Sequence, residues 1–263
     1  MGNMARIGTI IISLPKKRNP KALLESLSGL PINEIKILEA TIPMDLTCRE
    51  IVGDHEHYGN KRSMSCSEVS AAISHHRARA IAIAEDWDAV LILEDDAVLK
   101  DKSELLVILT QLQEQDHVPV LVHLFPEQYG IMRNRGNHEY FYDVIKIPDY
   151  AVSYILNRQA LKEIIKLAPV VNRDLADWPI GIKQLRLIAP KSSIFIHPVN
   201  DENVTSSSIW LGRNKILDAR KGIDRYRILE FYRFTLYKIV SLFSSKYGSN
   251  KIISEKLRSL ILK

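Results

Sequence analysis

The chain has 263 residues, of which 46% are apolar and 25% are charged. These values are typical of a globular protein and exclude a disordered, collagen-like or low-complexity chain. Two cysteines, Cys48 and Cys66, are too few for a disulfide scaffold or a four-thiolate zinc site. Because the sequence has neither a signal-peptide pattern nor an apolar run of about 20 residues, we expect a cytosolic protein that does not cross the membrane.

The charge is unevenly distributed along the chain. The formal net charge is +5, yet the segment from Arg213 to Lys263 alone has 13 lysines and arginines against 4 acidic residues. We therefore expect two parts, a mildly acidic domain at residues 1–212 and a basic helical appendage at residues 213–263. In a helix at 225–243, one apolar arc would pack on the domain.

The rest of that helix combines Arg227, Arg233 and Lys238 with tyrosines and phenylalanines. Basic and aromatic side chains together favour the headgroup layer of an anionic membrane. An oligomer interface is the alternative, and a nucleic-acid surface has no supporting motif. We expect a peripheral position on the inner face of the cytoplasmic membrane, and an oligomer is possible.

Apolar runs alternate with helical patterns in the first half of the domain, which favours an open, mostly parallel α/β sheet flanked by helices. Ile7–Leu14 and Ala89–Glu94 are apolar almost throughout, as strands buried on both faces are. The predicted strands are 7–14, 35–39, 89–94, 118–125, 140–147, 151–156 and 193–197. The predicted helices are 20–27, 68–86, 103–115 and 158–167.

In the helix at 68–86, apolar residues recur at the helical period and share a stripe with His76. The pattern predicts that His76 is a core histidine, whereas Ser74 and His75 lie off the stripe and face either solvent or a ligand. Glu68 stands three residues after Ser65, the spacing of a capping box. A capping role and a functional role for Glu68 are both left open.

Three adjacent carboxylates, Glu94-Asp95-Asp96, follow the apolar strand directly. Ligands of open α/β sheets bind at the carboxyl ends of strands, and a carboxylate cluster there is costly without a cation. Magnesium and manganese prefer oxygen ligands and often bridge carboxylates to substrate phosphates. The triplet thus indicates a divalent metal site, with a solvated acidic turn as the alternative.

The stretch from Glu68 to His75, together with the strand that ends in Glu94-Asp95-Asp96, resembles glycosyltransferase family 25, the lipooligosaccharide galactosyltransferase-like proteins. Their pattern is Gly-Glu-x-Gly-Cys-x-x-Ser-His followed by an apolar strand and Glu-Asp-Asp. Similar stretches occur at 10–18, 150–160, 176–178 and 207–209, so the resemblance covers roughly residues 6–210. Ser67 and Ser70 replace the family's glycines, and Ala71 its cysteine.

The resemblance implies a GT-A type fold, a nucleotide-sugar donor, a divalent metal and transfer with inversion. Asp96 is then the principal metal ligand with Glu94 as the second candidate, and Glu94 and Asp95 would contact metal-bound water or the donor ribose. The residues that end the first strand would hold the nucleotide: Ser13, Leu14, Pro15 and Arg18. Ser74 and His75 are also candidates for binding the donor.

Asp177 is the predicted catalytic base, because it matches the family's later aspartate and precedes Trp178, an aromatic platform for a sugar. Its alternative is a place at a helix start before Pro179. His197 could bind metal, but a lone histidine before Pro198 is more often structural.

We expect an inverting hexosyltransferase that moves galactose from UDP-galactose to a lipooligosaccharide, lipopolysaccharide or capsule glycan. Glucosyl or N-acetylhexosaminyl transfer is the alternative within the fold. A non-catalytic, membrane-associated glycan-assembly protein and a metal-dependent phosphohydrolase are the alternatives from other classes.

Overall fold

The computed structural model describes residues 5–14, 19–42, 66–112, 118–125, 132–134, 141–144, 151–167, 178, 182 and 185–197. The predicted appendage at 213–263 lies outside these residues, as do Pro15, Arg18 and Asp177. Among the described residues, no helix is both long and apolar enough to cross a membrane.

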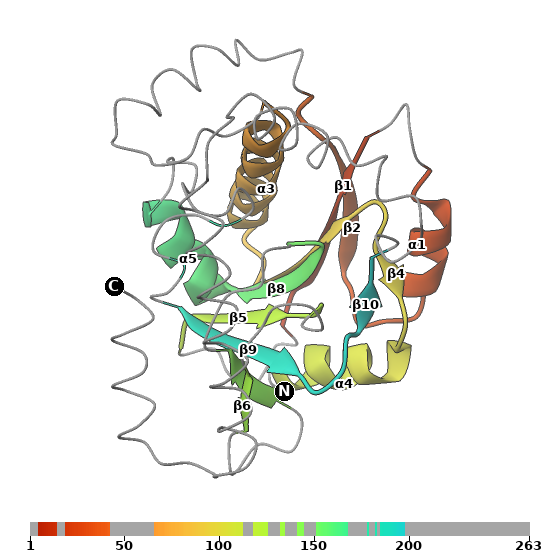
Figure 1. Cartoon of the computed structure of the whole chain (residues 1–263), viewed down its shortest axis with the longest axis vertical. Coiled ribbons are helices and arrows are strands. Elements are labelled where there is room, and N and C mark those ends of the chain that lie inside the picture. The colour runs from red at the N-terminus through yellow and green to blue at the C-terminus, as the bar shows by residue number, and fades with distance from the viewer. Residues whose placement is uncertain are drawn as a thin grey trace, which may run out of the picture.

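An eight-stranded sheet forms the centre of the described fold, in the order β2-β1-β3-β8-β5-β9-β7-β6 (Figure 1). The pairs β2–β1, β1–β3 and β5–β9 are parallel, and the remaining pairs are antiparallel. As a result only β8 and β7 run against the common direction. The strands are β1 (Ile7–Ser13), β2 (Glu34–Glu39), β3 (Ala89–Glu94), β5 (Val120–His123), β6 (Met132–Asn134), β7 (Phe141–Val144), β8 (Ser153–Asn157) and β9 (Arg186–Pro190).

Helices cover both faces of this sheet. One hydrophobic cluster joins Ile7 and Ile11 of β1 to apolar residues of α1 (Lys21–Leu27) and α4 (Lys102–Leu112). The other joins Ile10 and Ile12 to α3 (Cys66–Ala84) and α5 (Arg158–Leu167). Successive residues of a strand point to opposite faces, so the apolar run of β1 supplies both clusters. The predicted fold class, an open and mostly parallel sheet flanked by helices, is confirmed.

Gly8 allows the indole of Trp87 to pack directly on β1. A Cβ atom at Gly8 would lie 2.0 Å from Cε3 of Trp87, a distance at which no side chain fits. Trp87 itself is 1% exposed and lies two residues before β3. The glycine therefore fixes the packing between the strand that carries the acidic triplet and its central neighbour.

A second, two-stranded sheet lies beside the first and pairs β4 (Val98–Leu99) with β10 (Phe195–Ile196) in antiparallel register. The amide of Ile194 donates to the carbonyl of Leu124, and the amide of Lys100 donates to the carbonyl of Ile194. These bonds bring the segment that precedes His197 against the segment that follows the triplet. Figure 1 shows β10 and β4 side by side.

Candidate metal and donor site

The acidic triplet forms a turn at the carboxyl end of β3. Glu94 is the last residue of the strand, and the amide of Ala97 donates to the Glu94 carbonyl at 3.1 Å. The amide of Asp95 donates to the carbonyl of Ile12 in β1 at 3.0 Å. The triplet is thus held between two central parallel strands, where open α/β sheets bind ligands.

Asp95 fastens the end of β1 to this turn. Its Oδ2 accepts hydrogen bonds from the Leu14 amide at 2.9 Å and the Ser13 hydroxyl at 3.2 Å. Ser13 is 2% exposed, so its hydroxyl is directed to the carboxylate and away from solvent. The structure therefore brings three of the predicted site residues together, and Asp95 orders the backbone of the other two.

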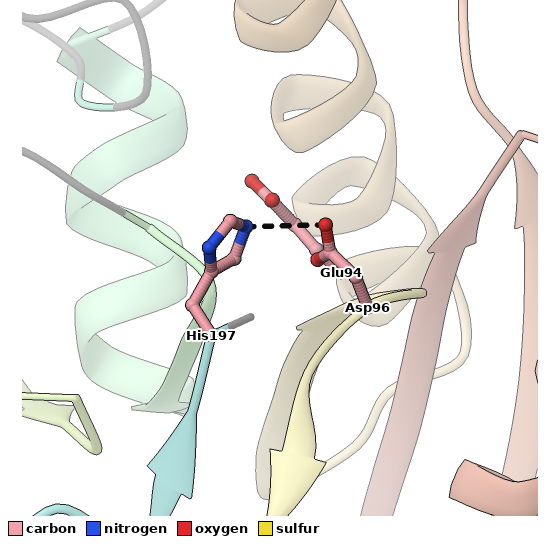
Figure 2. Close-up of side chains that lie close together, drawn as sticks. All are labelled: Glu94, Asp96 and His197. Carbon is pink, nitrogen blue, oxygen red and sulfur yellow. Dashed lines mark ion pairs between the residues drawn. The ribbon is translucent and has the colours of Figure 1, made fainter. Parts of the chain in front are cut away.

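Glu94 and Asp96, from the turn at the end of β3, converge with His197, which follows β10 (Figure 2). One ligand atom of each lies within 4.8 Å of those of the other two, and His197 Nε2 is 3.1 Å from Asp96 Oδ2. The side chains of Asp96 and His197 are only 10% and 15% exposed. Since Ile196 pairs with Val98, His197 follows directly opposite the end of the triplet turn.

The three side chains fit a single divalent ion. Two donor atoms at about 2.1 Å from one ion lie at most about 4.2 Å apart, so this group needs only small side-chain rotations to enclose it. Two carboxylates and one imidazole supply mixed oxygen and nitrogen donors. The remaining positions of a six-coordinate ion would be left to water or to the phosphates of a ligand.

The orientation predicted for α3 is wrong over much of its length. His75, which was expected to lie off the stripe, is 1% exposed, whereas His76, which was expected to lie in it, is half-buried. The pKa of His76 is lowered, first by burial and then by the positive charge of Arg79. The reason for the error is that ionisable residues share the inward face of the helix: Glu68, His75 and Arg79 are all buried.

The two predicted donor-binding residues of α3 make different contacts. Ser74 is 1% exposed, accepts a hydrogen bond from the Thr41 amide at 2.9 Å and donates to the Ser70 carbonyl at 2.8 Å. It thereby fastens the segment after β2 to the helix. His75 faces the triplet, with its Nε2 3.4 Å from Oε1 of Glu94. Neither side chain faces solvent.

Trp178 is not an exposed platform for a sugar. It is 1% exposed and packs against Tyr154 and His123, with ring centroids 5.0 Å and 5.9 Å away. Its burial in the cluster below α3 and α5 explains why an aromatic residue stands at this position. The predicted base, Asp177, precedes it and lies outside the described residues.

His197 is the member of the candidate metal site for which the sequence favoured a structural role. Its sequence context, a single histidine before a proline, carries no metal-binding signal. What places it beside Asp96 is the pairing of β4 with β10, which joins segments about 100 residues apart. Only the short apolar run at 194–196, predicted as a strand, hinted at this arrangement.

An open, mostly parallel sheet with acidic residues at the carboxyl end of one of its strands is the fold class that the sequence predicts. The sequence model of glycosyltransferase family 25, described as an LPS biosynthesis protein family, matches residues 7–177. The chain therefore belongs to glycosyltransferase family 25, as its sequence predicts. Among curated proteins, none matches the chain.

Solved structures include distant likenesses to this chain. CMP:2-keto-3-deoxy-manno-octonic acid synthetase complexed with CTP has 11% identity and a TM-score of 0.47, covering 80% of this chain and 100% of its own. A putative glucose-1-phosphate thymidylyltransferase from Bacillus anthracis has 12% identity and a TM-score of 0.45, covering 76% and 93%. A glycosyltransferase involved in glycosylation of the major capsid of PBCV-1 has 13% identity and a TM-score of 0.42, covering 76% and 96%.

Proposed function

We propose that this glycosyltransferase is a metal-dependent, inverting hexosyltransferase that moves galactose from UDP-galactose to a lipooligosaccharide, lipopolysaccharide or capsule glycan. The observation that supports it best is the convergence of Glu94, Asp96 and His197 at the carboxyl end of β3. Two of these residues were expected from the sequence to bind metal, and the third completes the group. Membership in the family supports the transferase activity.

In this proposal Asp96, Glu94 and His197 hold the ion, and the imidazole favours a transition ion such as manganese over magnesium. A bound divalent ion offsets the negative charge that develops on the departing diphosphate. Asp95 keeps Ser13 and Leu14 at the strand end. We propose that the backbone there borders the nucleotide, with the Ser13 hydroxyl holding Asp95 in place. Pro15 and Arg18 extend the same segment and are proposed to contact the nucleotide as well.

The base is proposed to be Asp177, which would take the proton from the acceptor hydroxyl as an oxocarbenium-like centre develops at the donor sugar. With Trp178 buried next to it, the acceptor sugar is not stacked on that indole. The basic appendage at 213–263 is proposed to hold the enzyme at the inner face of the cytoplasmic membrane, where a lipid-linked acceptor is found.

A panel of nucleotide sugars with and without manganese tests this function. UDP release from UDP-galactose in the presence of manganese, stimulated by a lipooligosaccharide acceptor, is the expected result. A preference for UDP-glucose or a UDP-N-acetylhexosamine would change the assigned donor but would still indicate a glycosyltransferase. Absence of turnover and of binding for every donor would leave a non-catalytic assembly protein, and turnover of simple phosphate esters would indicate a phosphohydrolase.

A further inference from the structure

A chain of polar contacts runs beneath the triplet from α3 to the end of β3. Nη1 of Arg79 lies 3.5 Å from the Tyr154 hydroxyl, which lies 3.1 Å from Nδ1 of His75. Nε2 of His75 lies 3.4 Å from Oε1 of Glu94. Arg79, Tyr154 and His75 are at most 2% exposed, whereas the Glu94 side chain is 29% exposed. The chain thus connects the interior to a carboxylate that a ligand can reach.

The chemistry of these groups gives the contacts a direction. A guanidinium only donates hydrogen bonds, so the Tyr154 oxygen accepts from Arg79. The phenolic hydrogen of Tyr154 is the donor that Nδ1 of His75 can accept, and this is the direction that the proposal below adopts. A neutral imidazole that accepts at Nδ1 carries its proton on Nε2, where it donates to Glu94. Each group therefore has the hydrogen-bonding role that the next one requires.

The position of Tyr154 is itself well determined. The residue lies on the antiparallel strand β8, where it pairs with Ile92 of β3 and with His123 of β5. Its ring is fully buried and packs on Trp178 at a centroid distance of 5.0 Å. A hydroxyl on so constrained a ring offers the imidazole a fixed partner.

We propose that His75 is a positioning residue, kept in the Nε2–H form by Tyr154 and Arg79, that fixes the orientation of the Glu94 carboxylate. This inference rests on the proposed function, because Glu94 is taken there as a metal ligand. His75 does not contact the donor, since its side chain is 2% exposed. Outer partners that orient metal ligands typically contribute about 10- to 100-fold in metal affinity or activity.

The first test is independent of activity. Long-range proton–nitrogen spectra of protein labelled with ¹⁵N-histidine report which ring nitrogen of His75 carries the proton. We expect the Nε2–H form in the parent and a mixture of both tautomers in Tyr154→Phe, which keeps the ring but removes the hydroxyl. The Nδ1–H form or a doubly protonated ring in the parent, or an unchanged spectrum in the variant, would overturn the proposal.

The second test compares rates and manganese affinity. Tyr154→Phe should lower kcat or manganese affinity by about 10- to 100-fold with KM for the acceptor unchanged. His75→Gln, whose amide can donate to Glu94, should retain more activity than His75→Ala. In the His75→Gln background, adding Tyr154→Phe should have little further effect on kcat, because an amide needs no fixed tautomer.

His76→Gln is the matched control, because it changes the neighbouring histidine on the same helix without touching the chain of contacts. Its kcat and manganese affinity should equal those of the parent. A lower melting temperature in Tyr154→Phe with unaltered kcat and manganese affinity would show a merely structural role and refute the proposal. If the parent transfers no sugar, the proposed function fails, while the tautomer and the manganese affinities still decide on the positioning role.

Discussion

Asp96→Asn is the sharpest perturbation of the candidate metal site. The substitution keeps the size of the side chain and removes the charge that a bound ion would require. Without metal we expect little change in the free energy of unfolding, because the loss of the 3.1 Å contact with His197 is opposed by relief of repulsion from Glu94 and Asp95. With metal, the parent should become more stable to unfolding than Asp96→Asn.

The size of the stability difference follows from the thermodynamic linkage between ligand binding and folding. A ligand at 100 times its dissociation constant stabilises the folded state by about 2.7 kcal/mol. For a domain of about 150–250 residues this corresponds to a rise in melting temperature of about 5 to 10 °C. The parent should show this rise with manganese plus UDP, Asp96→Asn should show almost none, and His197→Ala should lie between them because both carboxylates remain.

Differential scanning fluorimetry over a manganese titration measures all three proteins. Asp86→Asn is a suitable control, since Asp86 precedes the opposite end of β3 and its φ of 55° is one that asparagine tolerates. The control should respond to manganese as the parent does. An equal rise in Asp96→Asn and the parent would falsify the assignment of Asp96 as a metal ligand.

Three further predictions concern packing, pH and the appendage. Gly8→Ala should lower the free energy of unfolding by about 1–3 kcal/mol in urea titrations, because its methyl group enters the space of the Trp87 indole, and a cost below that range would mean that the ring moves freely. Because the pKa of His76 is lowered in the folded state, the unfolded state binds the proton more readily, so stability should fall as pH drops through about 6.5. His76→Gln should make that fall shallower in denaturation curves at pH 7.5 and 5.5, and an unchanged slope would contradict the reasoning. Changing Arg227, Arg233 and Lys238 together to Glu should weaken co-sedimentation with anionic vesicles, most at low salt, and leave hydrolysis of the nucleotide sugar nearly unchanged. Lost hydrolysis would mean that the appendage helps to build the active site.

The parallel strands at the centre of the sheet could be predicted because each is recognisable from its own short stretch of sequence. Ile7–Leu14 and Ala89–Glu94 contain strands buried on both faces, and such strands are recognised in a sequence as continuous apolar runs. The direction of β8 could not be predicted, because nothing in 153–157 distinguishes a parallel from an antiparallel partner of β3. The strand β9 was missed, since its partly polar sequence ends in Pro190, a residue that is rare inside sheets.

The candidate site likewise has one part that the sequence predicts and one part that it does not. The triplet was visible because its three carboxylates follow a strand without interruption. The inward face of α3 was misjudged because hydrophobic periodicity assigns apolar residues to the interior, whereas here Glu68, His75 and Arg79 occupy it. Buried ionisable residues are rare without partners, and the partners of His75 and Arg79 lie on β3 and β8, where a helical pattern cannot reveal them.

The pairing of β4 with β10 also has a consequence for the order of events during synthesis. A growing chain that has emerged only as far as β9 contains Glu94 and Asp96 but not His197. For the proposed metal site, the complete set of three ligands would therefore be available only after β10 has docked. The proposed site would thus stay incomplete in a nascent chain until the last described strand is in place.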